Sequence, residues 1–307
     1  MEGQHALFSR IQLMTVTTES PPAARRAPGT DTADATPHPA TVAVRSVVTP
    51  LRVGITTLWL SVIVLLPLAA IAWQSGTKGW QGFWLAVTSH AALESFRVTL
   101  TISVLVTVLD VVFGLATAWV LVRDDFVGKG AIDALIDLPF ALPTIVTSLV
   151  MLALYGSASP IGIHLQHTPP GVAMALAFVT LPLVVRAVQP VLMEIDRDVE
   201  EAAAALGATR LTTFTTVVLP SLQPAILTGA GLAFSRCVAE FGSVVTIGGA
   251  VPGKTEVSSQ WIRALVENDD HTSAAAISMV LLAISLAVLV VLRTVGGRAA
   301  KREEQDE

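Results

Sequence analysis

Six apolar segments alternate with polar stretches along this chain, and each is long enough to cross a membrane. A helix rises about 1.5 Å per residue, so about 20 residues span a hydrocarbon core about 30 Å thick. The pattern therefore predicts an all-α, polytopic membrane protein with six transmembrane helices. The segments are Val53–Trp73, Val98–Val122, Ala131–Tyr155, Val172–Leu192, Pro224–Ile247 and Ser273–Leu292.

The third segment is the least regular of the six. Asp133, Asp137, Pro139 and Pro143 crowd its first half. Each proline removes a backbone donor and disturbs the helix before it, so the freed polar groups need new partners inside the membrane. The sequence predicts a kinked or late-entering helix here.

The ends of the chain differ from its centre. Residues 1–50 are rich in Thr, Ala, Pro and Ser without apolar periodicity, which predicts a disordered cytoplasmic tail. Its apolar run begins too late for a signal peptide, and Met14 is an alternative start. We expect one transmembrane domain over 51–297 and a short cytoplasmic tail over 298–307.

Composition supports a membrane location. Hydrophobic residues make up 52% of the chain, charged residues 14%, and the mean hydropathy is +0.66. The net charge of −5 indicates no nucleic-acid partner. Cys237 is the single cysteine, so an intrachain disulfide is excluded. The six histidines are scattered, and no metal-binding motif is present.

Cationic residues flank the apolar segments unevenly. One side holds Arg45, Arg52, Arg123, Lys129, Arg197, Arg210, Arg293, Arg298, Lys301 and Arg302, against Lys78, Arg97, Lys254 and Arg263 on the other. The positive-inside rule places both termini, and the polar loop around Glu201, in the cytoplasm. Trp73, Trp80 and Trp84 fit an aromatic belt at the outer face.

The polar loop after the fourth segment, about 194–222, predicts two short helices. Asp198 and Glu201 resemble a capping box, and with Glu200 they put three carboxylates in the first turn, where the helix dipole favours negative charge. Gly207 can take the left-handed conformation that ends the first helix. A second helix, about Thr209–Val218, is predicted to stop before Pro220.

The spacing of seven residues in this loop resembles the cytoplasmic coupling loop of permease subunits in bacterial ABC importers. The matching residues are Glu201, Ala202, Ala203, Gly207, Val217, Leu219 and Pro220. The resemblance implies that Glu200, Glu201, Ala202, Ala203, Gly207, Leu219 and Pro220 couple the chain to an ATPase. An ordinary capped surface helix is the alternative, although it would not require Leu219-Pro220 at that distance.

Over residues 51–293 the chain looks like the T-type permease of the sulfate/thiosulfate ABC importer. The matching stretches are DLPFALPT at 137–144, VVRAVQPVL at 184–192, EEAAAALGATR at 200–210, AEFG at 239–242 and KTEV at 254–257. Molybdate permeases carry the same loop and are the nearest alternative.

The resemblance implies the fold of a type I ABC importer permease in the cell inner membrane. It also implies the partners: a second, W-type permease, two ATP-binding subunits that carry ATP-Mg, and an extracytoplasmic sulfate-binding protein. No cofactor is expected in this chain. Two other classes remain as alternatives: a self-sufficient secondary transporter, which would need inverted repeats, and a membrane enzyme, which would need clustered catalytic residues.

Among the charged residues within the apolar segments, four are candidates for the translocation pathway. They are Arg236, Glu240, Arg186 and Asp110. Such residues usually face a bundle interior or a wet cavity. For Arg236 and Glu240, spaced four apart, two interpretations stay open: an ion pair that holds helices together, or an arginine that lines the path of an anion.

Residues 248–255 read GGAVPGKT and match the phosphate-loop pattern. Pro252 removes a backbone N–H where the loop needs donors, and the preceding segment is predicted to be a helix rather than a strand. We therefore do not interpret it as a nucleotide site. Val257, Trp261, Ile262 and Leu265 follow at helical spacing, which predicts a short helix that either meets a binding protein or packs on the chain's own outer rim.

Overall fold

The computed structural model describes residues 52–306, with side chains described to 296. All regular structure in this part of the chain is helical. The chain divides into two units, Met1–Leu58 and Trp59–Glu307. The described residues of the first unit, 52–58, are helical. The predicted N-terminal tail lies outside the described residues.

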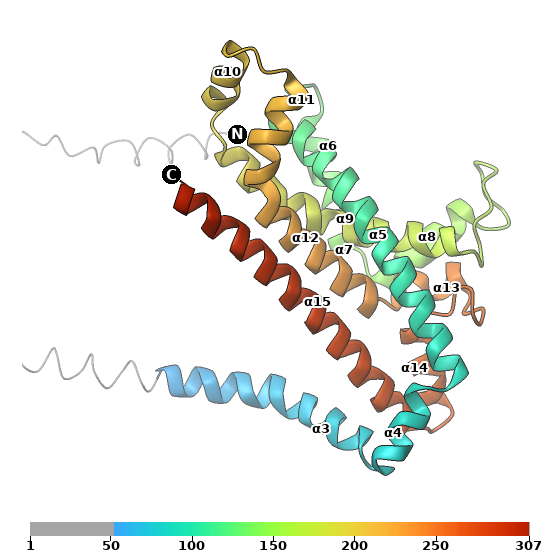
Figure 1. The fold of residues 1–307 in the computed structure, drawn as a ribbon. Coiled ribbons are helices and arrows are strands. Elements are labelled where there is room, and N and C mark those ends of the chain that lie inside the picture. Colours follow the sequence, from blue (N-terminus) through green and yellow to red (C-terminus); the bar gives the residue numbers. More distant parts are fainter. Residues whose placement is uncertain (1–51, 307) are drawn as a thin grey trace, which may run out of the picture. The chain divides into compact units, whose positions relative to one another are not determined.

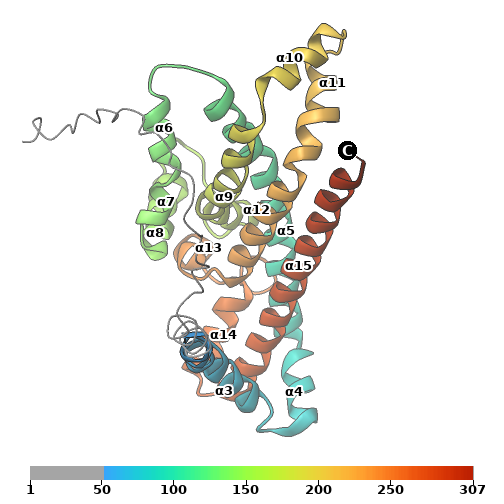
Figure 2. The ribbon, with the colours of Figure 1, turned by 90° about the vertical axis from the view of Figure 1, so that its left-hand side faces the viewer.

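The second unit is a bundle of long helices with short helices at its two ends and along one flank (Figure 1). Its elements are η1 (Ser61–Leu65), α3 (Leu66–Ser75), α4 (Gly79–Val87), α5 (His90–Arg123), α6 (Lys129–Ile136), α7 (Leu138–Ala141), α8 (Thr144–Tyr155), α9 (Pro169–Glu194), α10 (Arg197–Ala205), α11 (Arg210–Thr213), η2 (Phe214–Val218), α12 (Leu219–Ala239), η3 (Gly242–Val244), α13 (Val245–Gly248), α14 (Ser258–Glu267) and α15 (His271–Asp306). The α10 and α11 helices project from one end, opposite α4 and α14 (Figures 1 and 2).

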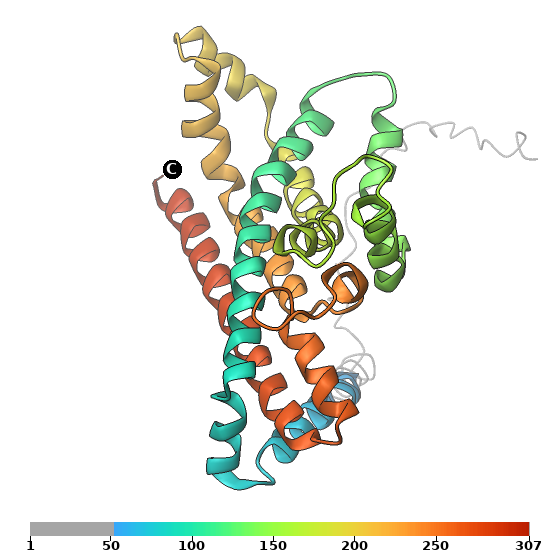
Figure 3. The same cartoon turned by 90° about the vertical axis from the view of Figure 1, so that its right-hand side faces the viewer.

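Five helices in the described chain are long and apolar enough to cross a membrane. They are Arg52–Ser75, His90–Arg123, Pro169–Glu194, Arg210–Ala239 and His271–Gly296. The predicted count of six exceeds this by one, because the third predicted segment is not one continuous helix. It is divided among α6, α7 and α8, which lie together along one flank of the bundle (Figure 3).

The prolines explain this division. Leu142, the residue before Pro143, is extended at φ −91° and ψ 134°, which is the conformation that a following proline imposes. Pro143 itself is extended in ψ, and α8 begins at the next residue. The predicted kink is therefore present, and it is sharp enough to leave only the 12-residue α8 as an apolar helix.

The core forms where α5, α9 and α12 pack together. Gly114 of α5 and Gly229 of α12 both lie against Val184 of α9, which is fully buried. A Cβ at Gly114 would stand 2.9 Å from the Val184 side chain, and a Cβ at Gly229 would stand 3.0 Å from the Val184 Cα. Small residues thus let the three backbones approach closely, as is common between membrane helices.

Candidate functional site

The segment from α10 to α11 forms a hairpin, Arg197–Thr213, that we call the α10–α11 hairpin. Its first helix is capped by Asp196, whose side chain accepts the N–H of Asp198. The predicted capping box between Asp198 and Glu201 is therefore wrong: the helix begins two residues earlier than that box requires. Asp198 and Glu200 lie in the first turn, in keeping with the helix dipole.

Gly207 ends α10 in the left-handed conformation that the sequence predicts, with φ +89°. The Gly207 N–H donates to the Ala204 carbonyl, and the Ala208 N–H donates to the Ala203 carbonyl. These two bonds make a Schellman motif, which satisfies carbonyls at the end of the helix. No atom outside its neighbours lies within 4 Å of a Cβ built at Gly207, so the requirement for glycine is conformational rather than steric.

The second helix of the loop does not stop before Pro220, contrary to prediction. It runs without interruption from Arg210 to Ala239. The turn before the proline, Phe214–Val218, is a π-helix, in which the Leu219 N–H bonds to the Phe214 carbonyl five residues earlier. The wider turn accommodates a residue that has no N–H and whose ring crowds the preceding turn. The hairpin is thus continuous with the membrane helix α12.

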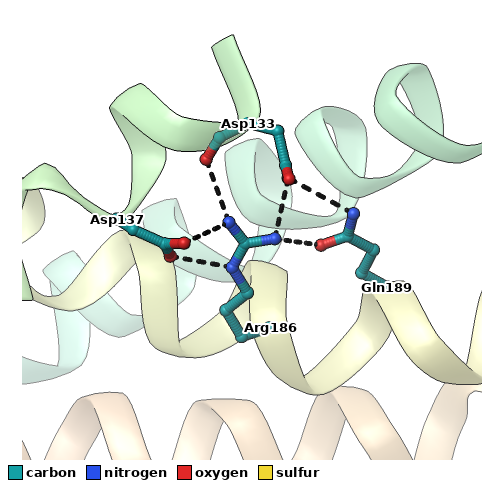
Figure 4. Close-up of polar contacts among 4 residues, drawn as sticks. All are labelled: Asp133, Asp137, Arg186 and Gln189. Atoms are coloured by element: carbon teal, nitrogen blue, oxygen red, sulfur yellow. Dashed lines mark hydrogen bonds and ion pairs between the residues drawn. The ribbon is translucent and has the colours of Figure 1, made fainter. Parts of the chain in front are cut away.

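Arg186 of α9 holds α6 and α7 in place (Figure 4). Its Nε and Nη2 donate to the two Asp137 carboxylate oxygens at 2.8 and 2.7 Å, and Nη1 donates to Asp133 Oδ1 at 2.7 Å. Nη1 also donates to Gln189. This fork geometry, which lysine cannot reproduce, ties the irregular third segment to the core.

Arg236 and Glu240 form an ion pair at the end of α12, with Nη1 and Oε2 2.6 Å apart. The predicted fifth span, Pro224–Ile247, is wrong at both ends, because the helix starts at Arg210 and stops at Ala239. Glu240 turns extended, and its Oε1 accepts the N–H of Ser243. This local side-chain bond competes with the helix and so ends it.

A cavity of about 410 Å³ borders this pair, lined by residues that include Pro143, Thr144, Arg236 and Gly242. The cavity lies where the break before α8 meets the end of α12. Both earlier interpretations of Arg236 are therefore compatible with its position, since it is paired and also borders open space.

Asp110 of α5 is buried and accepts a hydrogen bond from the Thr180 hydroxyl of α9 at 2.5 Å. The Cys237 thiol of α12 donates to the same hydroxyl at 3.6 Å. Within residues 52–296 no cationic side chain pairs with Asp110. Three core helices thus share one small polar network.

The GGAVPGKT loop folds back on itself: the Thr255 hydroxyl donates to the Gly248 carbonyl, and Val251 N–H donates to Thr255. The segment before it is the four-residue helix α13 and not a strand, although the membrane helix expected there ends earlier, at Ala239. The helix predicted after the loop is α14. Its residues Trp261, Ile262 and Leu265 pack against a buried hydrophobic cluster of the same chain. This contact favours packing on the outer rim over an exposed docking face.

Sequence reasoning missed Arg123, Asp133 and Asp137 as ion-pair partners. Arg123 was assigned only to the positive flank, yet its Nη2 lies 2.6 Å from Glu200 Oε1. The two aspartates were noted only as irregularities in the third segment. Their one signal in the sequence was the presence of carboxylates beside an apolar run, which implies a cationic partner in the fold.

Residues 110–300 match the family described as "Binding-protein-dependent transport system inner membrane component". The chain belongs to this family. It is therefore a membrane-spanning transport subunit rather than an enzyme, and neither the membrane enzyme nor the self-sufficient transporter is favoured. Membership also means that it works with a partner permease, an ATPase and a binding protein.

Two individual relatives support this family membership. The chain is 41% identical over 259 residues to the "Sulfate transport system permease protein CysT" of Salmonella typhimurium, covering 82% of this chain and 94% of the relative. The protein of the same name from Synechocystis sp. is 40% identical, with 78% and 86% covered.

A solved structure shares the fold. A chain of a bacterial alginate ABC transporter, crystallised with its alginate-bound periplasmic protein, superposes with a TM-score of 0.70 at 16% identity, covering 83% of this chain and 95% of that one.

Proposed function

We propose that this permease forms the membrane pathway of an ATP-driven importer for sulfate, with thiosulfate as a further substrate. The observation that carries the proposal is the 41% identity to a sulfate permease across 94% of that protein's length. A molybdate importer was the nearest alternative, because molybdate permeases carry a similar loop at 200–210, but the sulfate permeases among the relatives do not favour it.

In this proposal the α10–α11 hairpin receives the movement of the ATPase. Glu201, Ala202 and Leu206 are exposed on it, so its slim, alanine-rich first helix is open to a partner. Its second arm continues as one helix into α12, which supports direct transfer of movement into the membrane. ATP-Mg would then be bound by the partner ATPase and not by this chain.

The assembly consists of this chain, a W-type permease, two ATP-binding subunits and an extracytoplasmic sulfate-binding protein. Both termini and the hairpin face the cytoplasm, which the uneven distribution of Lys and Arg supports. Reporter fusions after Thr209 and after Lys254 test this orientation. They are expected to report cytoplasm and exterior respectively, and the same signal from both positions would refute it.

Substrate choice is tested on the reconstituted complex. Its ATP hydrolysis is measured with binding protein loaded with sulfate, thiosulfate or molybdate, at equal protein concentration. Stimulation by sulfate and not by molybdate is the expected result. Stimulation by molybdate alone would replace sulfate with molybdate in this proposal.

A further inference from the structure

One side chain joins the α10–α11 hairpin to the end of α5 that lies nearest the cytoplasm in the proposed orientation. Arg123 is the last residue of α5, and its side chain is only 10% exposed. Its Nη2 lies 2.6 Å from Glu200 Oε1 on α10 and donates to the Ile195 carbonyl at 3.2 Å, in the link that precedes α10. In return, Arg197 Nη2 donates to the Arg123 carbonyl at 3.1 Å.

Aromatic contacts extend this junction to the other arm of the hairpin. The Arg123 guanidinium carbon lies 5.9 Å from the centroid of the Trp119 ring, one turn earlier on α5. Trp119 in turn meets Phe214 of η2 edge-on, with ring centroids 5.3 Å apart. These side chains also line a cavity of about 370 Å³ that lies between the hairpin and the end of α5.

The two adjacent glutamates of α10 differ in what they contact. The Glu200 side chain is 24% exposed and paired with Arg123, whereas Glu201 is exposed. Glu200 is thus paired within the chain, whereas Glu201 forms no ion pair with any residue between 52 and 296. Glu200, which the sequence resemblance predicts to couple the chain to the ATPase, is turned toward α5.

We propose that Arg123 is a positioning residue which, through Glu200, makes the α10–α11 hairpin and α5 move as one body. The inference rests on the proposed role of the hairpin in receiving the ATPase movement. Through the Arg123–Glu200 pair, a displacement of α10 reaches α5 directly, in addition to α9 and α12, to which the hairpin is covalently joined. Because α5 packs tightly on Val184, the displacement is then carried into the core.

The test compares variants of the reconstituted complex of permeases, ATPase and binding protein. Arg123→Gln and Glu200→Gln break the pair, and Lys129→Gln is the matched control, because it removes an exposed pair with Asp125 just beyond the same end of α5. The measured quantity is sulfate transported per ATP hydrolysed. Coupling energies between sites typically correspond to 5–150-fold effects, so we expect this ratio to fall about tenfold in both pair variants and to stay unchanged in the control. A purely structural role would reduce transport and hydrolysis together and leave the ratio unchanged, which would overturn the proposal.

A second measurement does not depend on the substrate. Hydrogen exchange of the amides in 197–205 is expected to be about tenfold faster in Arg123→Gln than in the wild type or in Lys129→Gln, because local opening becomes easier. Equal exchange rates would also overturn the proposal. If exchange is faster in Arg123→Gln but the wild-type complex does not transport sulfate, the result supports the junction and counts against the assignment of sulfate.

Discussion

The guanidinium of Arg236 and the carboxylate of Glu240 meet 2.6 Å apart, with the glutamate side chain 1% exposed and the arginine side chain 40% exposed. This asymmetry means that the carboxylate depends on the arginine for its charge balance. The arginine, by contrast, retains access to the adjoining cavity.

Removing the arginine is therefore expected to be the more damaging change. Arg236→Met leaves a buried carboxylate unpaired at a cost of about 3 kcal/mol, so the variant should show reduced membrane abundance and assembly. Glu240→Gln should be milder, because glutamine still accepts the Ser243 N–H. Immunoblotting of membranes quantifies abundance in both.

The double variant Arg236→Met/Glu240→Gln distinguishes the two roles of this pair. Recovery of both abundance and sulfate uptake is the expected result, since no charge is then left uncompensated. A double variant that assembles normally but does not transport would show that Arg236 serves the anion directly.

Gly207→Val is expected to abolish uptake while the protein remains in the membrane. A β-branched residue resists φ +89°, at a cost of about 1–2 kcal/mol, and the hairpin would lose its sharp turn. Gly128→Val is the matched control: Gly128 has φ +93°, equally open surroundings and a position in the loop between α5 and α6. Uptake that is equally reduced in both variants would indicate general strain and contradict a special role for the hairpin.

Arg186→Lys is expected to destabilise the protein almost as much as Arg186→Met. Lysine keeps the charge but cannot engage Asp133 and Asp137 with a planar fork, so we expect a loss of about 2 kcal/mol in either case. Thermal unfolding in detergent measures the effect. A lysine variant as stable as the wild type would mean that charge alone, and not geometry, holds the third segment.

Much of this architecture follows from apolar length alone, which located the long helices to within a few residues at most ends. The left-handed turn at Gly207 also follows from local sequence, because only the nearest residues determine it. The continuation of the helix through Pro220 does not follow from local sequence. It requires the π-helical turn before the proline, which depends on how the hairpin joins α12. The pairs Arg123–Glu200 and Arg186–Asp137 join residues far apart in sequence, so their partners emerge only when the helices pack.

Stability at acid pH is expected to depend on the Lys78–Asp270 pair, which joins the α3–α4 turn to the α14–α15 turn at 2.8 Å. The hydrogen bonds from Lys78 and Ser273 lower the pKa of Asp270 from 3.8 to about 2. A lowered pKa stabilises the fold above pH 3.8, and this contribution is lost as the pH falls toward 2. Lys78→Gln should flatten the decline in thermal stability between pH 4 and pH 2. A decline identical to that of the wild type would contradict this assignment.

Energy coupling to sulfate is the central claim, and uptake into proteoliposomes tests it most directly. The complete complex is reconstituted without any ion gradient, with sulfate-loaded binding protein on one side and ATP on the ATPase side. We predict accumulation of radiolabelled sulfate that requires hydrolysable ATP and the binding protein. A parallel set of proteoliposomes carries a proton or sodium gradient but no ATP. Accumulation of sulfate in that set, or no ATP-dependent accumulation in the gradient-free set, would contradict the claim.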